Sequence, residues 1–161
     1  MLIRELDPVN DLPAIIRVQT EAQDYWLLAE GHCDPTAKAA AFFTDTPPGC
    51  NSANSHRLGL FADGQLSGLA ELSFGFPEAQ DAYLGLMLLA PRLRSKGAGA
   101  VFLAEVERLA RLAGAPVLYL AVLEANPRGR AFWERMGFAA TGKSGRDAET
   151  GHVLHRLAKA L

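Results

Sequence analysis

The sequence predicts a mixed β-sheet with helices on both faces, a fold of the α/β (α+β) class. Three observations lead to this prediction. Residues 57–74 show strand periodicity on either side of a tight Asp-Gly turn, which indicates a β-hairpin. The runs 82–90 and 116–123 are almost wholly apolar, as in strands buried on both faces, and the segment 98–113 between them carries the apolar stripe of an amphipathic helix. Strand, helix and strand within about 40 residues imply a right-handed crossover that makes the two strands parallel.

The N-terminal part of the chain predicts one strand followed by two helices. A short strand at 2–6 ends at Asp7-Pro8, and Asn10 or Asp11 is placed to cap a helix with Pro13 in its first turn. Apolar residues recur at helical spacing as far as Trp26, which predicts one helix with an inward face. A second short helix is predicted at 35–43, and the polar segment 51–56 has the composition of a loop.

The rest of the chain alternates strands and helices. Pro91 ends the apolar strand 82–90, and Gly114 is the expected stop of the helix 98–113. After the strand 116–123, a short helix at 128–136 ends at Gly137, and two last strands are predicted at 138–141 and 152–157. With 161 residues, 49% of them hydrophobic, the chain is expected to form a single domain over 1–161.

Composition excludes several classes of function. A net charge of −2 gives no overall attraction to nucleic acid or to an anionic membrane, so any anion site must be local. The charged N-terminal residues do not form a signal peptide, and no apolar run is long enough to span a bilayer, so we expect a cytoplasmic protein. Two isolated cysteines and four scattered histidines show no metal-ligand spacing, and no metal is expected.

The segment Arg94-Ser95-Lys96-Gly97-Ala98-Gly99 joins a buried strand to the start of a helix. Unpaired N–H groups and the positive end of the helix dipole favour phosphate there, and glycine lets the backbone come close to a pyrophosphate. The segment matches neither the Walker A loop nor the dinucleotide fingerprint GxGxxG. Taken alone, it is equally well interpreted as a solvated turn.

A second motif lies downstream of this loop. Asn126 follows the strand 116–123, and Phe132-Trp133 precedes Gly137-Phe138 at the end of a short helix. With Arg94, Gly97 and Gly99 in the pattern [Q/R]xxGx[G/A], this arrangement resembles the GNAT superfamily of N-acetyltransferases. The resemblance covers most of the chain, and the two motifs together are far more specific than either one.

The resemblance implies a GNAT fold, a mixed and mostly antiparallel sheet of six to seven strands with a splayed central parallel pair, and acetyl-CoA as acetyl donor. Backbone groups of the bulged strand would bind the pantetheine arm, and an N–H there, assigned to Leu88, would polarise the thioester carbonyl. Asn126 would bind pantetheine or order its loop, although it is equally placed to cap the next helix. The implied cofactor-binding residues are Met87, Leu88, Leu89, Arg94, Ser95, Lys96, Gly97, Ala98, Gly99, Asn126, Phe132 and Trp133.

The acid and base are not fixed by the resemblance. The family's frequent general acid is a Tyr at the position of Trp133, and an indole N–H has no useful acidity. Either another residue supplies the proton or the thiolate leaves unprotonated. The attacking amine must lose a proton, and the candidate bases are Glu71, Glu124, and Asp24 with Tyr25. Glu71 is either an inward carboxylate with a raised pKa or the outward phase of an alternating strand, and the pattern favours the outward phase. We assign Glu71, Leu88 and Tyr25 as catalytic.

The predicted function is direct transfer of an acetyl group from acetyl-CoA to a primary amine of a small molecule or peptide, by a monomer or homodimer. Two other functions use the same loop. One is a non-catalytic acyl-CoA-binding regulatory module, which the Trp133 departure admits. The other is a nucleotide-binding regulator, for which ATP or NAD would compete with CoA.

Overall fold

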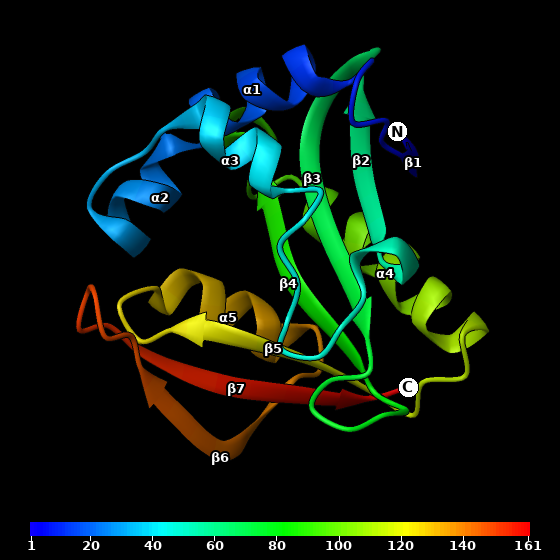
Figure 1. Ribbon diagram of the computed structural model, residues 1–161, viewed down its shortest axis with the longest axis vertical. Helices are drawn as coiled ribbons and strands as arrows, with labels where there is room; N and C mark the ends of the chain where they lie inside the picture. The colour runs from blue at the N-terminus through cyan, green and yellow to red at the C-terminus, as the bar shows by residue number, and fades with distance from the viewer.

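The computed structural model describes residues 1–161 and contains a seven-stranded sheet in the order β1-β2-β3-β4-β5-β7-β6 (Figure 1). Only β4 and β5 are parallel, which confirms the predicted mixed, mostly antiparallel sheet. The strands are β1 Leu2–Glu5, β2 His56–Ala62, β3 Gln65–Phe74, β4 Ala82–Leu89, β5 Val117–Leu123, β6 Ala139–Arg146 and β7 Val153–Ala160. The helices are α1 Leu12–Glu21, α2 Gln23–Glu30, α3 Pro35–Ala41, α4 Ala98–Leu112 and α5 Pro127–Arg135, with 3₁₀ turns at Ser52–Asn54 and Pro91–Leu93.

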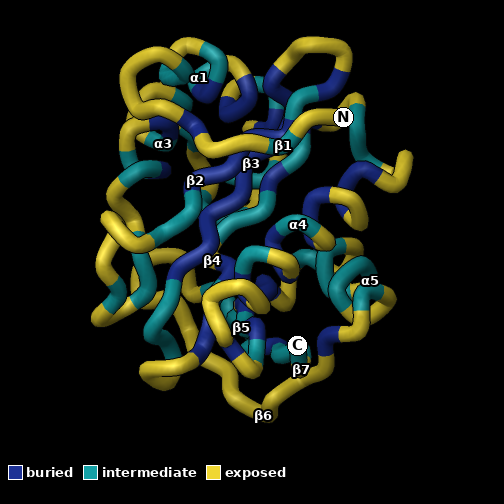
Figure 2. Tube along the Cα trace, turned by 90° about the vertical axis from the view of Figure 1, so that its right-hand side faces the viewer, coloured by how far each residue is buried: buried dark blue, intermediate teal, exposed yellow.

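A hydrophobic core lies on each face of the sheet. Phe102 and Val106 of α4 pack against Leu72 and Leu118 on one face, where α5 also joins the core. Because neighbouring residues of β3 point to opposite faces, Leu69 lies in the other core beneath α1 and α3. Figure 2 shows the result: β3 is buried along most of its length, whereas the edge strand β6 is exposed throughout.

The predicted hairpin forms between β2 and β3. Asp63 and Gly64 both have positive φ, at 50° and 73°, as the two central residues of a type I′ turn require. The ladder on either side pairs Ala62 with Gln65 and continues to the pair His56 and Leu72. This hairpin places residue 71 in the middle of the sheet, next to β4.

Strand β4 pairs with β5 only at its beginning. The pairs are Ala82 with Leu118 and Tyr83 with Tyr119, after which the two strands diverge, as Figure 1 shows. The prediction that 82–90 is buried on both faces is therefore wrong for its second half, where Gly85 is exposed and Met87 is half-buried. The loss of the neighbouring strand opens one side of β4.

A β-bulge accompanies this divergence. On the β3 side, Glu71 pairs with Leu86 and Leu72 pairs with Leu84, so Gly85 is an extra residue in β4. The side chain of Glu71 occupies the space that a Cβ at position 85 would need, which explains why this residue is glycine. The splayed pair and the bulge agree with the expected family fold.

Two other predictions differ from the structure. The single helix predicted up to Trp26 is two helices, because the chain bends at Ala22, which ends α1 and begins α2. The last two strands, predicted at 138–141 and 152–157, are longer than predicted, because each has eight residues. None of the α-helices combines the length and the hydropathy of a membrane span.

Candidate functional site

Two cavities border strand β4, and the larger one lies between the diverging strands β4 and β5. Its volume is about 900 Å³. One wall is β4 from Leu84 to Leu89, and the opposite wall is β5 from Leu120 to Leu123. Met87, Leu88 and Leu89 all line the cavity, and none of them has a partner in β5. The backbone groups on this edge of β4, which would otherwise pair with β5, are therefore open to a ligand.

The loop after β4 closes one end of this cavity. Ser95 and Gly97 have positive φ, at 59° and 82°, and Lys96 between them does not. Such alternation of handedness turns successive N–H groups toward one point and makes an anion-binding concavity. Gly97 is the N-cap of α4, whose 15 residues add the positive end of a helix dipole. Ser95, Gly97 and Gly99 line the cavity, Lys96 is exposed in the loop, and Ala98 is buried beneath it.

Glycine occupies positions 97 and 99 of the loop for two different structural reasons. At Gly97, nothing lies within 4 Å of an added Cβ, so only the positive φ selects glycine. At Gly99, an added Cβ would lie 3.0 Å from Cζ of Phe132. Gly99 therefore allows α4 and α5 to approach closely, and this approach holds Phe132 at the cavity wall.

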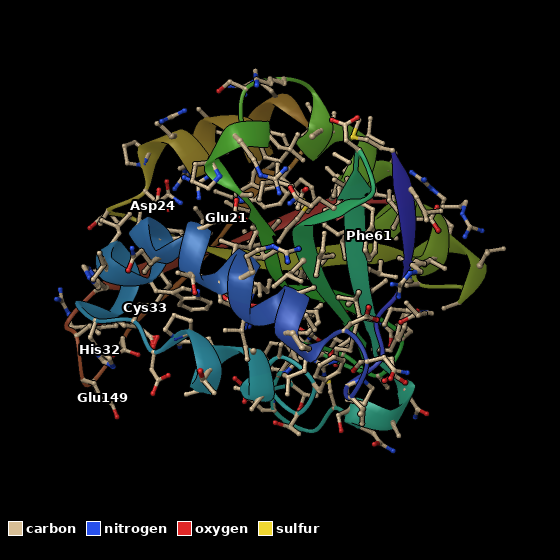
Figure 3. The ribbon with its side chains drawn as sticks, turned by 90° about the horizontal axis from the view of Figure 1, so that it is seen from above. Glu21, Asp24, His32, Cys33, Phe61 and Glu149 are labelled. Carbon is tan, nitrogen blue, oxygen red and sulfur yellow. The ribbon has the colours of Figure 1, made fainter.

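Arg94 connects the loop to α2. Its Nη1 and Nη2 donate to Asp24 at 2.5 and 3.0 Å, and its Nε donates to the carbonyl oxygen of Leu89 at 3.0 Å. The hydrogen bond from Arg94 lowers the pKa of Asp24, so this carboxylate stays ionised. Figure 3 shows Asp24 and Glu21 on the side of α1 and α2 that faces the segment after β4, where Glu21 pairs with Arg92 at 3.1 Å. Because Asp24 is an ion-pair partner, it is a poor candidate for a base.

Two further cations line the larger cavity, and the sequence pattern did not indicate them. Arg128 begins α5, and its Nη2 donates to Oγ of Ser95 at 3.5 Å, so it lies beside the anion-binding loop. Arg135 lies two turns further along the same helix. Their positions depend on α5 packing against α4, and the only local signal was the basic composition of residues 128–135.

Asn126 has a structural role and also borders the cavity. Its Oδ1 accepts from the N–H of Gly129 at 3.0 Å, which caps α5. An amide also carries two donors on Nδ2, so capping leaves this residue able to bind a ligand. Phe132 and Trp133 line the cavity as well, with Trp133 packed edge-on between Phe132 and Phe138 at ring distances of 4.9 and 5.5 Å.

A smaller cavity of about 350 Å³ lies on the other side of β4, beneath α1–α3. Gly85 and Leu86 line both cavities, so the two meet at the bulge. The smaller cavity is lined by Gln19, Trp26, Lys38, Ala41, Phe42, Asp45, Thr46, Pro47, Pro48, Arg57, Glu71, Phe76, Tyr83, Gly85, Leu86 and Arg156.

Glu71 lies in the smaller cavity and is only 4% exposed. Burial raises the pKa of its carboxyl group, while the hydrogen bond from Ser73 and the charge of Arg57 act in the opposite direction. The Arg57 Nη2 atom lies 3.7 Å from Oε1 of Glu71. The favoured interpretation of Glu71 as an outward-facing strand residue is thus wrong. Helices cover both faces of the sheet at β3, so neither set of alternating side chains faces solvent.

The remaining candidates lie elsewhere. Tyr25 lines the larger cavity, not the smaller one, and burial raises the pKa of its hydroxyl group. Glu124 is exposed, contacts His155 at 3.2 Å and lines neither cavity. The structure therefore brings together Glu71 and the bulge of β4 on one side, and Tyr25, Leu88 and the glycine loop on the other.

The strand order and the splayed parallel pair are those of the fold that the resemblance to the GNAT superfamily implies. Residues 15–138 match the model of the acetyltransferase (GNAT) family. The chain belongs to this family, as its resemblance to the superfamily predicted. A comparison with curated protein sequences finds no match.

Solved structures of acetyltransferases have the same fold. An acetyltransferase from Thermus thermophilus is 26% identical, with a TM-score of 0.74 over 100% of this chain and 98% of the other. The PaiA N-acetyltransferase from Thermoplasma acidophilum, solved in complex with coenzyme A, is 22% identical, with a TM-score of 0.71 over 99% of this chain and 98% of the other. A ribosomal-protein-alanine N-acetyltransferase from Brucella melitensis is 21% identical, with a TM-score of 0.76 over 100% of both chains.

Proposed function

We propose that this protein transfers the acetyl group of acetyl-CoA directly to a primary amine of a small molecule or peptide. The observation that carries the proposal is the meeting of two cavities at Gly85 and Leu86, with the buried carboxylate of Glu71 against the same bulge. The larger cavity would hold the acetyl donor and the smaller one the amine. Because they meet at β4, the two reactants can touch without a covalent enzyme intermediate.

The lining of the larger cavity supports coenzyme A as its ligand. The N–H groups of residues 95–99 and the side chains of Arg94 and Arg128 would bind the pyrophosphate. The unpaired edge of β4 at Met87 and Leu89 would bind the amides of pantetheine as another strand would. Asn126, Phe132 and Trp133 would border the same arm on the β5 side. Membership of the acetyltransferase family and the coenzyme A complex of a structural neighbour support this assignment.

Glu71 is the proposed general base. A carboxyl group whose pKa is raised by burial is a better match to the proton of an attacking amine than an exposed one. As the amine nitrogen bonds to the acetyl carbon, Glu71 takes its proton, directly or through one water. The N–H of Leu88, assigned to the oxyanion from the sequence, faces β3, because Leu88 and Leu69 form a hydrogen-bonded pair of the antiparallel ladder. The N–H of Met87, on the free edge of β4, would instead stabilise the negative charge that develops on the carbonyl oxygen.

Tyr25 is the proposed acid for the departing sulfur. It is the tyrosine of the larger cavity, and its raised pKa keeps the hydroxyl protonated at neutral pH. When the carbon–sulfur bond breaks, this hydroxyl can give its proton to the thiolate. Tyr25 would then take the part that the family's Tyr plays at the position of Trp133.

The test is acceptor-dependent release of free thiol from acetyl-CoA with a panel of amines, amino acids and peptides. Glu71→Gln is expected to lower kcat by about 100-fold or more at neutral pH, with an unchanged dissociation constant for CoA. Glu124→Gln is the matched control, because that carboxylate lies outside both cavities, and it should retain full activity.

Two results would contradict the proposal. Tight CoA binding without thiol release for any amine would favour the non-catalytic module. A Glu71→Gln variant with normal turnover would remove Glu71 as the base.

Tyr25→Phe, which keeps the ring, should lower kcat by about 10-fold or more while leaving CoA binding intact.

A further inference from the structure

Two residues that line the smaller cavity carry buried hydrogen-bond donors that have no partner. They are Nε2 of Gln19 and both Nε and Nη2 of Arg57. The two residues are 1% and 5% exposed, and both line the smaller cavity. Buried donors without an acceptor cost free energy, and such groups are rare in proteins unless a ligand or water satisfies them.

The orientation of each donor is fixed by a contact on its other side. Oε1 of Gln19 accepts from Nε1 of Trp26 at 2.6 Å, which sets the amide so that Nε2 is the free end. Nη1 of Arg57 donates to the carbonyl oxygen of Phe42 at 2.6 Å, which leaves the Nε and Nη2 edge unused. These contacts hold the donors in place before any ligand binds.

No side chain of the cavity provides the missing acceptor. Glu71 is the nearest carboxylate to Arg57, but its 3.7 Å distance exceeds a hydrogen bond, and its Oε1 already accepts from Ser73. The other charged groups of the lining are Lys38, Arg156 and Asp45. Lys38 pairs with Glu30 at 2.5 Å, and Arg156 lies over the ring of Phe76 at 5.1 Å. With Lys38 neutralised by Glu30, the lining has two cations and two carboxylates, so it is the unpartnered donors of Arg57 and Gln19 that favour an anionic group on the ligand.

We propose that the acceptor amine carries a carboxylate, as an amino acid does, and that Arg57 and Gln19 bind this carboxylate. The Nε and Nη2 edge of a guanidinium presents two parallel N–H donors, which match the two oxygens of a carboxylate. Gln19 Nε2 adds a third donor. The amine of the same molecule then extends toward Glu71 and the bulge at Gly85. The inference rests on the proposed function and narrows its substrate class.

The size of the cavity favours a small molecule. Its volume of about 350 Å³ lies at the lower end of the range for ligand pockets. The charged groups of polyamines and aminoglycosides are all cationic, and they offer no anionic oxygen to the unpartnered donors of Arg57, whose charge would repel them. A free amino acid or a short amino-acid-like compound has both the amine and the anion that the cavity requires.

The experiment compares thiol release for matched acceptors that differ only at the carboxylate. α-Amino acids are assayed beside the amines that lack the carboxylate and beside the neutral carboxamides. For the best acceptor, kcat/KM is expected to be about 10- to 100-fold higher with the carboxylate than with either matched compound. Equal rates for the carboxylate and its matched compounds would overturn the inference and leave the acetyltransferase proposal intact. No thiol release from any acceptor would overturn both.

Two variants connect the preference to the residues. Gln19→Glu keeps an oxygen for Trp26 but replaces the free donor by an acceptor, and Arg57→Gln removes the guanidinium. Each should abolish most of the carboxylate preference and change the rate with the matched amines much less. Because Arg57 is buried, its variant is first checked for normal CoA binding, and Gln19→Glu tests the inference independently. Arg108→Gln removes an exposed guanidinium outside both cavities and should keep the preference. A full preference in Gln19→Glu and Arg57→Gln would assign the carboxylate to other residues and contradict the inference.

Discussion

Glu71 illustrates how one residue depends on its neighbours for its chemistry. Its carboxylate accepts a hydrogen bond from Oγ of Ser73, and Oγ of Ser73 lies 3.0 Å from Oγ of Ser55. Burial favours the protonated carboxyl group, whereas the Ser73 hydrogen bond and the positive charge of Arg57 favour the carboxylate. The net direction is a raised pKa, because the effect of burial is the largest of the three.

This balance predicts a change in the pH profile. A base must be ionised to act, so kcat should rise with pH through the pKa of Glu71. Ser73→Ala removes a hydrogen bond that favours the carboxylate, which raises this pKa further and moves the acid limb of the profile to higher pH. Profiles of acceptor-dependent thiol release measure the shift.

The control for this change is Ser67→Ala. Ser67 is also buried on β3, but its hydroxyl donates to the carbonyl oxygen of Gln65, away from the carboxylate. Its acid limb should match that of the unmodified protein. An acid limb that does not move in Ser73→Ala would show that Glu71 is not the group that titrates.

At the scale of single elements, the strands and most helices could be predicted because their signals are local. The Asp63-Gly64 turn and the apolar run of β4 can each be recognised from a few consecutive residues. The bend at Ala22 could not be predicted, because apolar residues continue at helical spacing across it. The glycine loop was predictable from its composition, whereas Arg128 reaches it only through the packing of α5 on α4.

The orientation of Glu71 and the place of Arg57 depend on more distant contacts. Alternation along β3 separates the residues of the two faces but does not say which face is covered, and here α1 and α3 cover the second face. Arg57 lies at the polar beginning of β2, where a sequence pattern suggests an exposed residue. It is buried because it packs beneath α3, where it donates to Phe42.

Gly97→Ala and Gly114→Ala should strain the backbone equally but differ in their effect on CoA binding. Gly97 and Gly114 have φ of +82° and +80°, and an added Cβ would touch nothing at either site. Alanine in this conformation costs about 1–2 kcal/mol. Gly97→Ala should weaken CoA binding by about 5- to 30-fold, because the strained loop leaves its N–H groups misaligned in part of the population.

Gly114→Ala is the matched control, since it follows α4 at the end away from the loop. Gly114→Ala should lower the melting temperature by about as much as Gly97→Ala does, with no change in the dissociation constant for CoA. Calorimetric titration with CoA and thermal unfolding separate the two effects. Equal CoA affinity in both variants would argue against the loop as the pyrophosphate site.

At the scale of the whole molecule, the sheet consists of two parts that share a hydrophobic core but are joined by few strand pairs. β4 and β5 are joined by two residue pairs, while β2, β3 and β4 on one side and β5, β7 and β6 on the other have long ladders. Figure 1 shows how β4 and β5, the adjoining strands of the two parts, diverge. The larger cavity lies between these diverging strands. The cations that face it come from both parts, Arg94 after β4 and Arg128 after β5, so a bound polyanion would connect them.

This arrangement predicts where CoA binding reduces backbone motion. Hydrogen exchange should slow at residues 84–99, which include the free edge of β4 and the start of α4, and at 126–133 in α5, because the ligand satisfies N–H groups there and holds the two parts together. The exposed strand β6 contacts neither cavity, so its exchange should stay the same and serves as the internal control. Mass spectrometry of peptides after exchange, with and without CoA, measures both regions in one sample. Protection limited to β6 and β7, or protection at 84–99 produced equally by ATP, would contradict a coenzyme A site between the diverging strands.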